Sequence, residues 1–403
     1  MKIRLAVFFD QRLHAGGGFQ QALNAALVTS KIPSELATIL YFTYHKENIP
    51  ILQSYDLNPF MLHISFFDKI YSRIRSSIKQ PLLLRILKLV SKYSCLEAQF
   101  IRHNIDLVYF LSPSPWARTL ENLCYIFTVW DLCHRDHPEF PEVYSNREFE
   151  YREQLINSTI PRAIATISDS YSTKQKLFQR YGIDLDRIHV IPFQPAPALV
   201  NPADDNKSVN VTQKHNLDHP YIFYPAQFWP HKNHIYLIDG IHLLESMHNI
   251  KISAVFTGSD KSNQQHVTEY AMKLGLQKRI RFAGFVPNDE LRYYYLQSLA
   301  LVMPSYFGPT NLPPLEAFEL GVPILYPNLD GMAEQVGNAA LLIDINDPHS
   351  LANHLKLLIT DTSLRKRLIV SGYEQLSKIN TISRSSILSE IITKFSIKRS
   401  CWY

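Results

Sequence analysis

The chain of 403 residues has little of several features that mark specialised classes of protein. Its formal net charge is only +5, whereas a nucleic-acid-binding protein is expected to carry a concentrated basic face. Its four cysteines, Cys95, Cys124, Cys133 and Cys401, are scattered without metal-type spacing. This pattern favours a reduced cytosolic compartment over a disulfide framework.

Long apolar runs are also lacking. No segment approaches the roughly 18 uncharged apolar residues that a membrane-spanning helix needs. The first residues, MKIRLAVFF, are apolar over too short a stretch for a signal peptide. We therefore expect them to form a buried first strand.

What the sequence does contain is an alternation of short apolar runs with helical stretches, which indicates βαβ units. The continuous apolarity of these runs predicts parallel strands that are covered on both faces. The runs are Ile3–Phe9, Ala37–Phe42, Leu107–Leu111, Tyr125–Val129, Ala163–Ile167, Ile188–Ile191, Tyr221–Tyr224, Ile252–Thr257, Ile280–Phe282, Leu299–Met303, Val322–Tyr326 and Ala340–Ile343. The length suits two α/β domains.

A boundary between two domains is expected in IPFQPAPALVNPADDNKSVN, which is rich in Pro, Asn and Asp and has no periodicity. The expected organisation is a first Rossmann-like domain over 1–195, a linker over 196–215, a second Rossmann-like domain over 216–375 and a helical tail over 376–403 that can pack back on the first domain.

Residues 60–92 are unlike the rest, because bulky apolar residues alternate with seven lysines and arginines and a single Asp68 opposes them. A basic amphipathic helix of this kind can lie on an anionic membrane surface. A pair of surface helices packed on the first sheet and divided at Pro81 explains the pattern equally well.

Three glycines, Gly16, Gly17 and Gly18, follow the first predicted strand and precede a helical run. They allow the backbone to approach a phosphate at a helix N-terminus, although a tight strand-to-helix turn would use them as well. The full dinucleotide fingerprint and the lysine of a phosphate-binding P-loop are both missing, which argues against NAD and ATPase chemistry.

A second candidate loop, YPAQFWPHKN, leads from the first strand of the second domain into a helix. Lys232, near the start of that helix, can neutralise a pyrophosphate together with backbone N–H groups. The alternative is an ordinary solvated lysine.

The third candidate loop, MPSYFGPTNLPPLEAF, follows a strand of the second sheet and ends with Glu316 just inside a helix. Open α/β sheets bind ligands at this edge, and a carboxylate there suits the two hydroxyls of a ribose. A surface glutamate in a first helical turn is the simpler alternative.

Taken in order, these segments resemble the retaining glycosyltransferases of family 4, which have the GT-B fold of two Rossmann-like domains facing across a cleft. The resemblance covers most of the chain and is densest over residues 160–348. It is carried by ATISDSYSTKQKLFQRYGID, RIHVIPF, YPAQFWPHKNHIYLIDGI, FTGSD, IRFAGFVPNDELRYYYLQSLALVMPS and FGPTNLPPLEAFELGVPILYPNLDGMAEQVGNAALLIDINDP. The FGPTNLPPLEA form of the donor motif would define a subgroup.

The resemblance implies roles for individual residues. Glu316 would hold the donor ribose, Lys232 the donor diphosphate, and the Gly16–Gly18 loop would close over phosphate and sugar. Pro309, Thr310, Asn311 and Leu312 resemble the loop whose backbone N–H groups meet sugar hydroxyls and phosphate. The base is expected near Phe285 and Val286. No separate cofactor and no metal are implied, and no Asp-x-Asp set or His/Cys cluster occurs in a donor loop.

Three positions depart from the family pattern. Gly308 stands where the first glutamate of the pair is expected, Gln227 replaces an arginine, and Trp130 replaces a histidine at a strand end. We expect Asp131 or His134 to face the reacting sugar instead, and Thr310 and Asn311 to replace the contacts of the lost glutamate. A structural loop histidine is the alternative for His134.

The implied function is transfer of a hexosyl group, with mannose favoured, from a nucleotide-diphosphate sugar to a hydroxyl of a saccharide or lipid-linked polysaccharide, with retention of configuration. Lipopolysaccharide synthesis at the cytoplasmic face of the inner membrane would suit the basic stretch. The departures keep a non-catalytic nucleotide-sugar-binding scaffold open as an alternative, and a nucleotide-sugar epimerase of the same fold is a further one.

Overall fold

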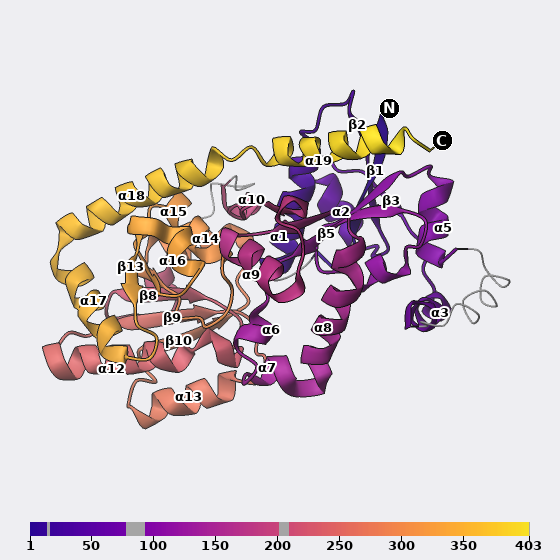
Figure 1. Ribbon diagram of the computed structural model, residues 1–403. Helices are drawn as coiled ribbons and strands as arrows, with labels where there is room; N and C mark the ends of the chain where they lie inside the picture. Colours follow the sequence, from indigo (N-terminus) through magenta and orange to yellow (C-terminus); the bar gives the residue numbers. More distant parts are fainter. Residues whose placement is uncertain (14–16, 78–92, 201–208, 403) are drawn as a thin grey trace. The chain divides into compact units, whose positions relative to one another are not determined.

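The computed structural model describes residues 1–13, 17–77, 93–200 and 209–402. They form two compact units (Figure 1). Unit 1 consists of Met1–Leu132, Glu150–Pro192 and Ser383–Tyr403, and unit 2 consists of Cys133–Phe149 and Phe193–Ile382. The chain therefore passes between the units at four places.

Unit 1 contains a seven-stranded sheet in the order β3-β2-β1-β4-β5-β6-β7, in which every pairing is parallel. Its strands are β1 (Ile3–Phe9), β2 (Ala37–Thr43), β3 (Pro59–Met61), β4 (Leu107–Phe110), β5 (Cys124–Val129), β6 (Ala165–Ser168) and β7 (Ile188–Val190). Its main helices are α1 (Gly17–Thr29), α2 (Asn48–Gln53), α3 (Phe66–Ser77), α5 (Cys95–Arg102), α8 (Glu148–Thr159), α9 (Tyr171–Tyr181) and α19 (Arg384–Arg399), with 3-10 turns η1 (Pro115–Thr119), η3 (Ile160–Arg162) and η4 (Leu185–Arg187).

The sheet of unit 1 is covered on both faces, as its apolar strands require. Along β1, side chains alternate between the two faces. Leu5 and Val7 join a core cluster that includes residues of α1 and α19, while Ala6 and Phe8 join the cluster on the opposite face. The C-terminal helix α19 thus completes the core of unit 1 through Ile392 and its neighbours.

Unit 2 contains a six-stranded parallel sheet in the order β10-β9-β8-β11-β12-β13, the doubly wound order of nucleotide-binding α/β domains. Its strands are β8 (Tyr221–Pro225), β9 (Ser253–Thr257), β10 (Ile280–Gly284), β11 (Ala300–Val302), β12 (Ile324–Pro327) and β13 (Leu341–Ile343). Its helices are α6 (Cys133–Asp136), α7 (Pro141–Tyr144), α10 (Pro197–Val200), α11 (Val211–Lys214), α12 (His234–His248), α13 (Gln264–Lys273), α14 (Asn288–Leu296), α15 (Leu312–Glu319), α16 (Met332–Val336), α17 (Pro348–Thr360) and α18 (Thr362–Asn380), with 3-10 turns η2 (Ser145–Arg147), η5 (Pro230–Lys232) and η6 (Gly337–Ala339).

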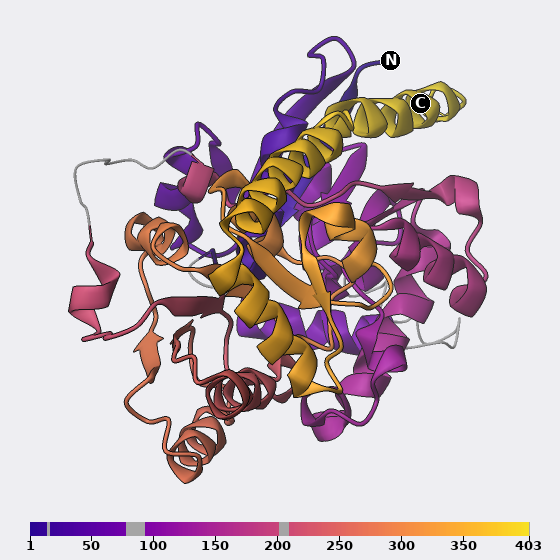
Figure 2. The same cartoon turned by 90° about the vertical axis from the view of Figure 1, so that its left-hand side faces the viewer.

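Helices α12 and α17 lie side by side in unit 2 (Figures 1 and 2). Their contact is close because α12 carries Gly240 there. A β-carbon on Gly240 would lie 2.4 Å from a methyl carbon of Leu351 in α17. A larger residue at position 240 would push the two helices apart.

The twelve predicted apolar runs each overlap an observed strand, so the expectation of two parallel-sheet α/β domains is confirmed. Strand β3 is an addition, in a stretch expected to be helical from residue 60 onward. It is an edge strand of three residues, too short to leave a pattern. Of the rest of that stretch α3 is helical, and residues 78–92, with the division expected at Pro81, lie outside the described residues.

The structure differs from the expected organisation in two local features. The expected linker 196–215 is not irregular throughout, because it contains α10 and α11. Ala196, Leu199 and Val211 are buried in the core of unit 2, which gives these two short helices a reason to form. In addition, Cys133–Phe149 groups with unit 2 although it lies within the expected first domain.

Within the described ranges, no helix combines the length and the apolar character required to cross a membrane.

Candidate functional site

The order of the strands in unit 2 points to one place for a ligand. Strands β8 and β11 are neighbours, and the chain winds outward from them in opposite directions. In such a sheet the crevice at the carboxyl ends of the two central strands is the usual ligand site. The loops that follow β8 and β11 are the two that carry Lys232 and Asn311, so the topology gathers the candidate motifs at one edge.

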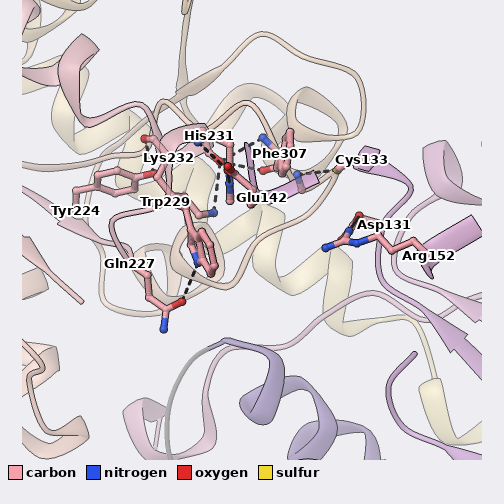
Figure 3. A network of polar contacts seen from close by, with 12 residues as sticks. Asp131, Cys133, Glu142, Arg152, Tyr224, Gln227, Trp229, His231, Lys232 and Phe307 are labelled. Carbon is pink, nitrogen blue, oxygen red and sulfur yellow. Dashed lines mark hydrogen bonds and ion pairs between the residues drawn. The ribbon is translucent and has the colours of Figure 1, made fainter. Parts of the chain in front are cut away.

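The loop after β8 begins with Gln227, whose Oε1 accepts a hydrogen bond from the indole Nε1 of Trp229 at 3.1 Å. The turn η5 then brings Lys232 to the start of α12, and Asn233 ends the turn with a left-handed backbone, φ 53°. The hydroxyl of Tyr224 donates to the carbonyl of Lys232 at 3.0 Å. The backbone that carries the lysine is thus fixed by the strand before it (Figure 3).

The loop after β11 meets the Lys232 turn directly. The Nζ of Lys232 donates to Oγ of Ser305 at 3.4 Å, and the N–H of Tyr306 donates to the carbonyl of His231 at 2.9 Å. Ser305 is itself held by Phe307, whose carbonyl accepts from its hydroxyl at 3.0 Å. Two motifs that lie about 70 residues apart in the sequence therefore form one surface.

Gly308 and Asn311 shape the rest of this loop. Gly308 has φ +93°, a conformation that residues with a side chain rarely adopt. The side-chain amide of Asn311 donates to the carbonyl of Gly308 at 3.0 Å and to the hydroxyl of Tyr326 at 2.7 Å. The backbone of Asn311 exchanges two hydrogen bonds with the amide of Gln335, at 3.0 and 2.7 Å. Asn311 therefore holds the loop, and the expected contact of its amide with a ligand stays a prediction.

Pro309 and Leu312 are buried, and Thr310 is half-buried. Pro309 packs closely on Gly331, where a β-carbon would lie 2.7 Å from that of Pro309. The loop is consequently rigid on its inner side.

Glu316 lies in α15 and is 6% exposed. Its Oε2 accepts a hydrogen bond from the hydroxyl of Tyr295 at 2.7 Å, and the backbone of Ala196 supplies another. Burial raises the pKa of this carboxyl group to about 7, and the two hydrogen bonds only partly offset that effect. A buried carboxyl group with so altered a pKa marks a candidate functional position, and the simple surface glutamate is excluded.

Phe285 and Val286 follow β10 at the same edge of the sheet. The Phe285 ring is 66% exposed, whereas Val286 is buried. An exposed ring beside a buried valine offers an apolar face of the kind that a base can stack on.

The two residues expected to face a reacting sugar belong to different units. Asp131 follows β5 in unit 1, and its Oδ1 lies 3.4 Å from a guanidinium nitrogen of Arg152. His134 belongs to unit 2, where it is fully buried and its ring centre lies 5.6 Å from that of Phe149. Burial of this kind is what the alternative of a structural histidine requires.

The glycine loop belongs to unit 1. Gly17 and Gly18 are the first residues of α1, and Gly16 lies outside the described residues. A β-carbon on Gly18 would lie 3.1 Å from ring carbons of Trp130, so a larger residue there would press on that ring. In the sheet of unit 1, β1 and β4 hold the central position that β8 and β11 hold in unit 2. The hydroxyl of Ser112, which follows β4, donates a hydrogen bond at 2.8 Å to the carboxylate of Asp10, which follows β1.

Several residues of the site carry no recognisable signal in the sequence. Tyr295 and Ser305 are ordinary residues of a helix and a loop, and Glu142 lies 89 positions from its partner His231. Among the described residues, no group of three or more His, Cys, Asp and Glu could hold a metal ion.

At the carboxyl ends of its strands, the doubly wound sheet of unit 2 therefore carries a lysine near the start of α12, a buried carboxyl group and, after the outer strand β10, an exposed aromatic ring. A cation beside backbone N–H groups suits a phosphate, and a carboxyl group suits hydroxyls. This combination is typical of an α/β protein that binds a phosphorylated, hydroxyl-rich ligand such as a nucleotide.

Comparison with known proteins indicates which class of nucleotide-binding proteins the chain resembles. Residues 207–375 match the family model described as glycosyl transferases group 1. The chain is also 24% identical over 241 residues to O-antigen chain mannosyltransferase B of Escherichia coli, an alignment that spans 60% of this chain and 63% of the relative. The alignment thus leaves more than a third of that relative unmatched.

Solved structures resemble the chain over nearly its full length. A glycosyltransferase from Rickettsia africae has a TM-score of 0.68 at 17% identity, with 98% of this chain and 99% of that one covered. HepE of Anabaena, solved in complex with UDP-glucose, has a TM-score of 0.67 at 15% identity, with 98% and 100% covered. The fold of the chain is therefore that of the GT-B glycosyltransferases, as the sequence resemblance implied.

Proposed function

We propose that the protein is a retaining glycosyltransferase that moves a hexosyl group from a nucleotide-diphosphate sugar to a hydroxyl of a saccharide or lipid-linked glycan. The observation that carries the proposal is the meeting of the Lys232 turn with the Ser305–Asn311 loop at the centre of the unit 2 sheet, beside buried Glu316. The match of residues 207–375 to group 1 glycosyl transferases supports the reaction class.

The chemistry follows from charge. Cleavage of the bond between sugar and phosphate leaves negative charge on the diphosphate and positive character on the anomeric carbon. Lys232, with the backbone N–H groups at the start of α12, stabilises the diphosphate. Glu316 binds the ribose hydroxyls and so fixes the nucleotide. The acceptor hydroxyl enters on the side of the leaving group and passes its proton to the phosphate, without a metal ion and without a pair of catalytic carboxylates.

The proposed donor is a mannosyl nucleotide, because the E. coli relative is a mannosyltransferase. HepE was solved with UDP-glucose, so guanine and uracil both have to be tested. Stacking on Phe285 would accept either base. The acceptor is proposed to be a lipid-linked polysaccharide, since the relative acts on an O-antigen chain.

The proposed location is the cytoplasm, at the inner face of the membrane. Helix α3 supports it, because Phe66 and Phe67 are exposed at 72% and 80% next to exposed Lys69. Two exposed aromatic rings beside a lysine suit an interface with anionic lipids.

The first test is thermal stabilisation of the protein by GDP, UDP, ADP and TDP, with Glu316→Ala alongside. A ligand at 100 times its dissociation constant adds about 2.7 kcal/mol. We expect one nucleotide to stabilise the wild type and not the variant. No stabilisation by any nucleotide would contradict the proposal.

The second test is turnover with the matching nucleotide-mannose. Transfer to an added acceptor, resistance to EDTA and an axial product linkage by NMR would support the reaction as proposed. Binding without turnover on any acceptor would favour the scaffold, an alternative for which Gly308 in place of a glutamate is the specific observation. Turnover without acceptor would favour an epimerase.

A further inference from the structure

The segment Cys133–Phe149 follows β5 of unit 1 in the sequence but belongs to unit 2. We refer to it as the brace. Its short helices α6 and α7 present Cys133 and Val143, which form an apolar cluster with Phe307. Phe140 packs on the same ring at 5.1 Å between centres. The brace is thus held by the loop that follows β11.

The brace also forms hydrogen bonds with the turn that carries Lys232. Oε1 of Glu142 accepts a hydrogen bond from the backbone N–H of His231 at 3.1 Å and pairs with Nδ1 of the same residue. The imidazole ring of His231 stacks on Phe307, with ring centres 4.2 Å apart and planes inclined by 14°. Glu142 is therefore joined to His231 by hydrogen bonds, and His231 is joined to Phe307 by ring stacking (Figure 3).

A third contact reaches the next residue of the β11 loop. The N–H of Gly308 donates to Sγ of Cys133 at 3.4 Å. His137, also in the brace, stacks on Phe307 with ring centres 5.5 Å apart and planes inclined by 28°. Both loops of the candidate site are thus fixed from one side by the same short piece of chain.

The character of Glu142 indicates more than a surface ion pair. The side chains of Glu142 and His231 are 9% and 12% exposed. Burial raises the pKa of the Glu142 carboxyl, but the hydrogen bonds from His231 and from the backbone N–H of Glu142 itself together outweigh burial, so that the pKa is below its ordinary value. A carboxylate that is buried and held in this way has strong directional preference, and removal of one partner leaves the other buried without it.

We propose that Glu142 is a positioning residue, which through His231 sets the angle of the turn that aims Lys232 at the donor diphosphate. This inference rests on the proposed function of Lys232. It differs from a general structural role in one respect. The loss of Glu142 should weaken contacts to the second phosphate and leave contacts to the nucleoside unchanged.

The test compares binding of a nucleoside diphosphate with binding of the matching monophosphate by calorimetry, using the base that stabilises the wild type. In Glu142→Ala we expect diphosphate affinity to fall about tenfold, which corresponds to about 1.4 kcal/mol, and monophosphate affinity to stay within twofold. Glu142→Gln, which keeps an oxygen acceptor, should recover most of the loss. Glu139→Ala is the matched control, because Glu139 is in the same segment and its side chain is 66% exposed.

A double-mutant cycle with Lys232→Ala completes the design. If Glu142 acts through Lys232, the second substitution adds little to the first, whereas independent effects add fully. Full additivity, or an equal loss for both nucleotides, would overturn the inference. If Glu142→Ala does not fold, His231→Phe, which can keep the stack on Phe307 but loses the ring bond to Glu142, replaces it with the same expected outcomes.

The outcomes separate the two proposals. A wild type that binds no nucleoside diphosphate contradicts the proposed function and, with it, the role of Glu142. A wild type that binds the diphosphate and is unaffected by Glu142→Ala contradicts the positioning role alone.

Discussion

A β-carbon on Gly308 would lie 2.8 Å from Oδ1 of Asn311, closer than such contacts occur in proteins. The amide of Asn311 cannot easily withdraw, because it donates to the carbonyl of Gly308 and to the hydroxyl of Tyr326. Gly308 and Asn311 thus require each other. The position at which the sequence comparison expected a glutamate is therefore shaped for a glycine, and a glutamate there would be strained by both the positive φ and the contact with Asn311.

We accordingly expect Gly308→Glu to destabilise the protein without improving donor binding. The positive φ and the contact with Asn311 together should cost roughly 1–3 kcal/mol or more, measured by denaturant unfolding. Gly275→Ala is the control, since Gly275 has φ +71° but open space around a β-carbon. An equal cost at both positions would show that the contact with Asn311 contributes nothing.

The raised pKa of Glu316 predicts a dependence of stability on pH. Because the pKa is about 7 in the folded state and near 4.5 in the unfolded chain, the folded protein binds the extra proton between these values. The stabilisation that this bound proton gives to the folded state is fully present below pH 4.5 and is lost as the pH rises through 7. The free energy of unfolding should fall by on the order of 3 kcal/mol over this range. Unfolding of Glu316→Gln between pH 5 and 8 should lack this decline, and a decline as steep as in the wild type would rule out Glu316 as its source.

Lys232→Ala should lower kcat by about a hundredfold, a magnitude typical of the loss of one group that stabilises a developing anion. Its unfolding free energy should change little, because Lys232 is only half-buried and the backbone of its turn is held by the hydroxyl of Tyr224, not by the lysine side chain. Lys251→Ala, at a lysine that is 52% exposed, is the control. A parallel loss of stability and turnover would instead assign Lys232 a structural role.

Alanine substitutions in α19 should show how much this C-terminal helix contributes to the stability of unit 1. Ile392 is fully buried in the unit 1 core, so Ile392→Ala should cost about 2–5 kcal/mol. Ile397, on the same helix, is 67% exposed, and Ile397→Ala should be nearly neutral. Equal effects in a denaturant titration would contradict the packing of α19.

Replacement of both Phe66 and Phe67 by alanine should weaken sedimentation with vesicles that contain anionic lipid. The variant loses two exposed rings, so its stability should hardly change. Phe178→Ala, with a ring that is 45% exposed on α9, is the control. Vesicle binding that survives in the double variant would remove α3 from the proposed membrane contact.

The sequence predicted the fold because each buried strand is a continuous apolar run, and it predicted the two loops of the site because carboxyl ends of parallel strands share an edge. Lys232 and the Ser305–Asn311 loop could be predicted as parts of the site in this way. Glu142 was not, since its contact with His231 joins distant parts of the chain. The hydrogen bonds that Asn311 makes within the protein could not be predicted for a related reason, because its partners Tyr326 and Gln335 become neighbours only after folding.

The four passages of the chain between the units have a consequence for the exchange of domains between related proteins. No continuous stretch of the sequence encodes a complete unit, because unit 2 includes Cys133–Phe149 and unit 1 includes Ser383–Tyr403. A hybrid of two related proteins joined near residue 193 would combine the Glu142 of one parent with the His231 of the other. Relatives that exchange halves can therefore keep this contact only where both parents share the pair, and substitutions at the two positions should be found together.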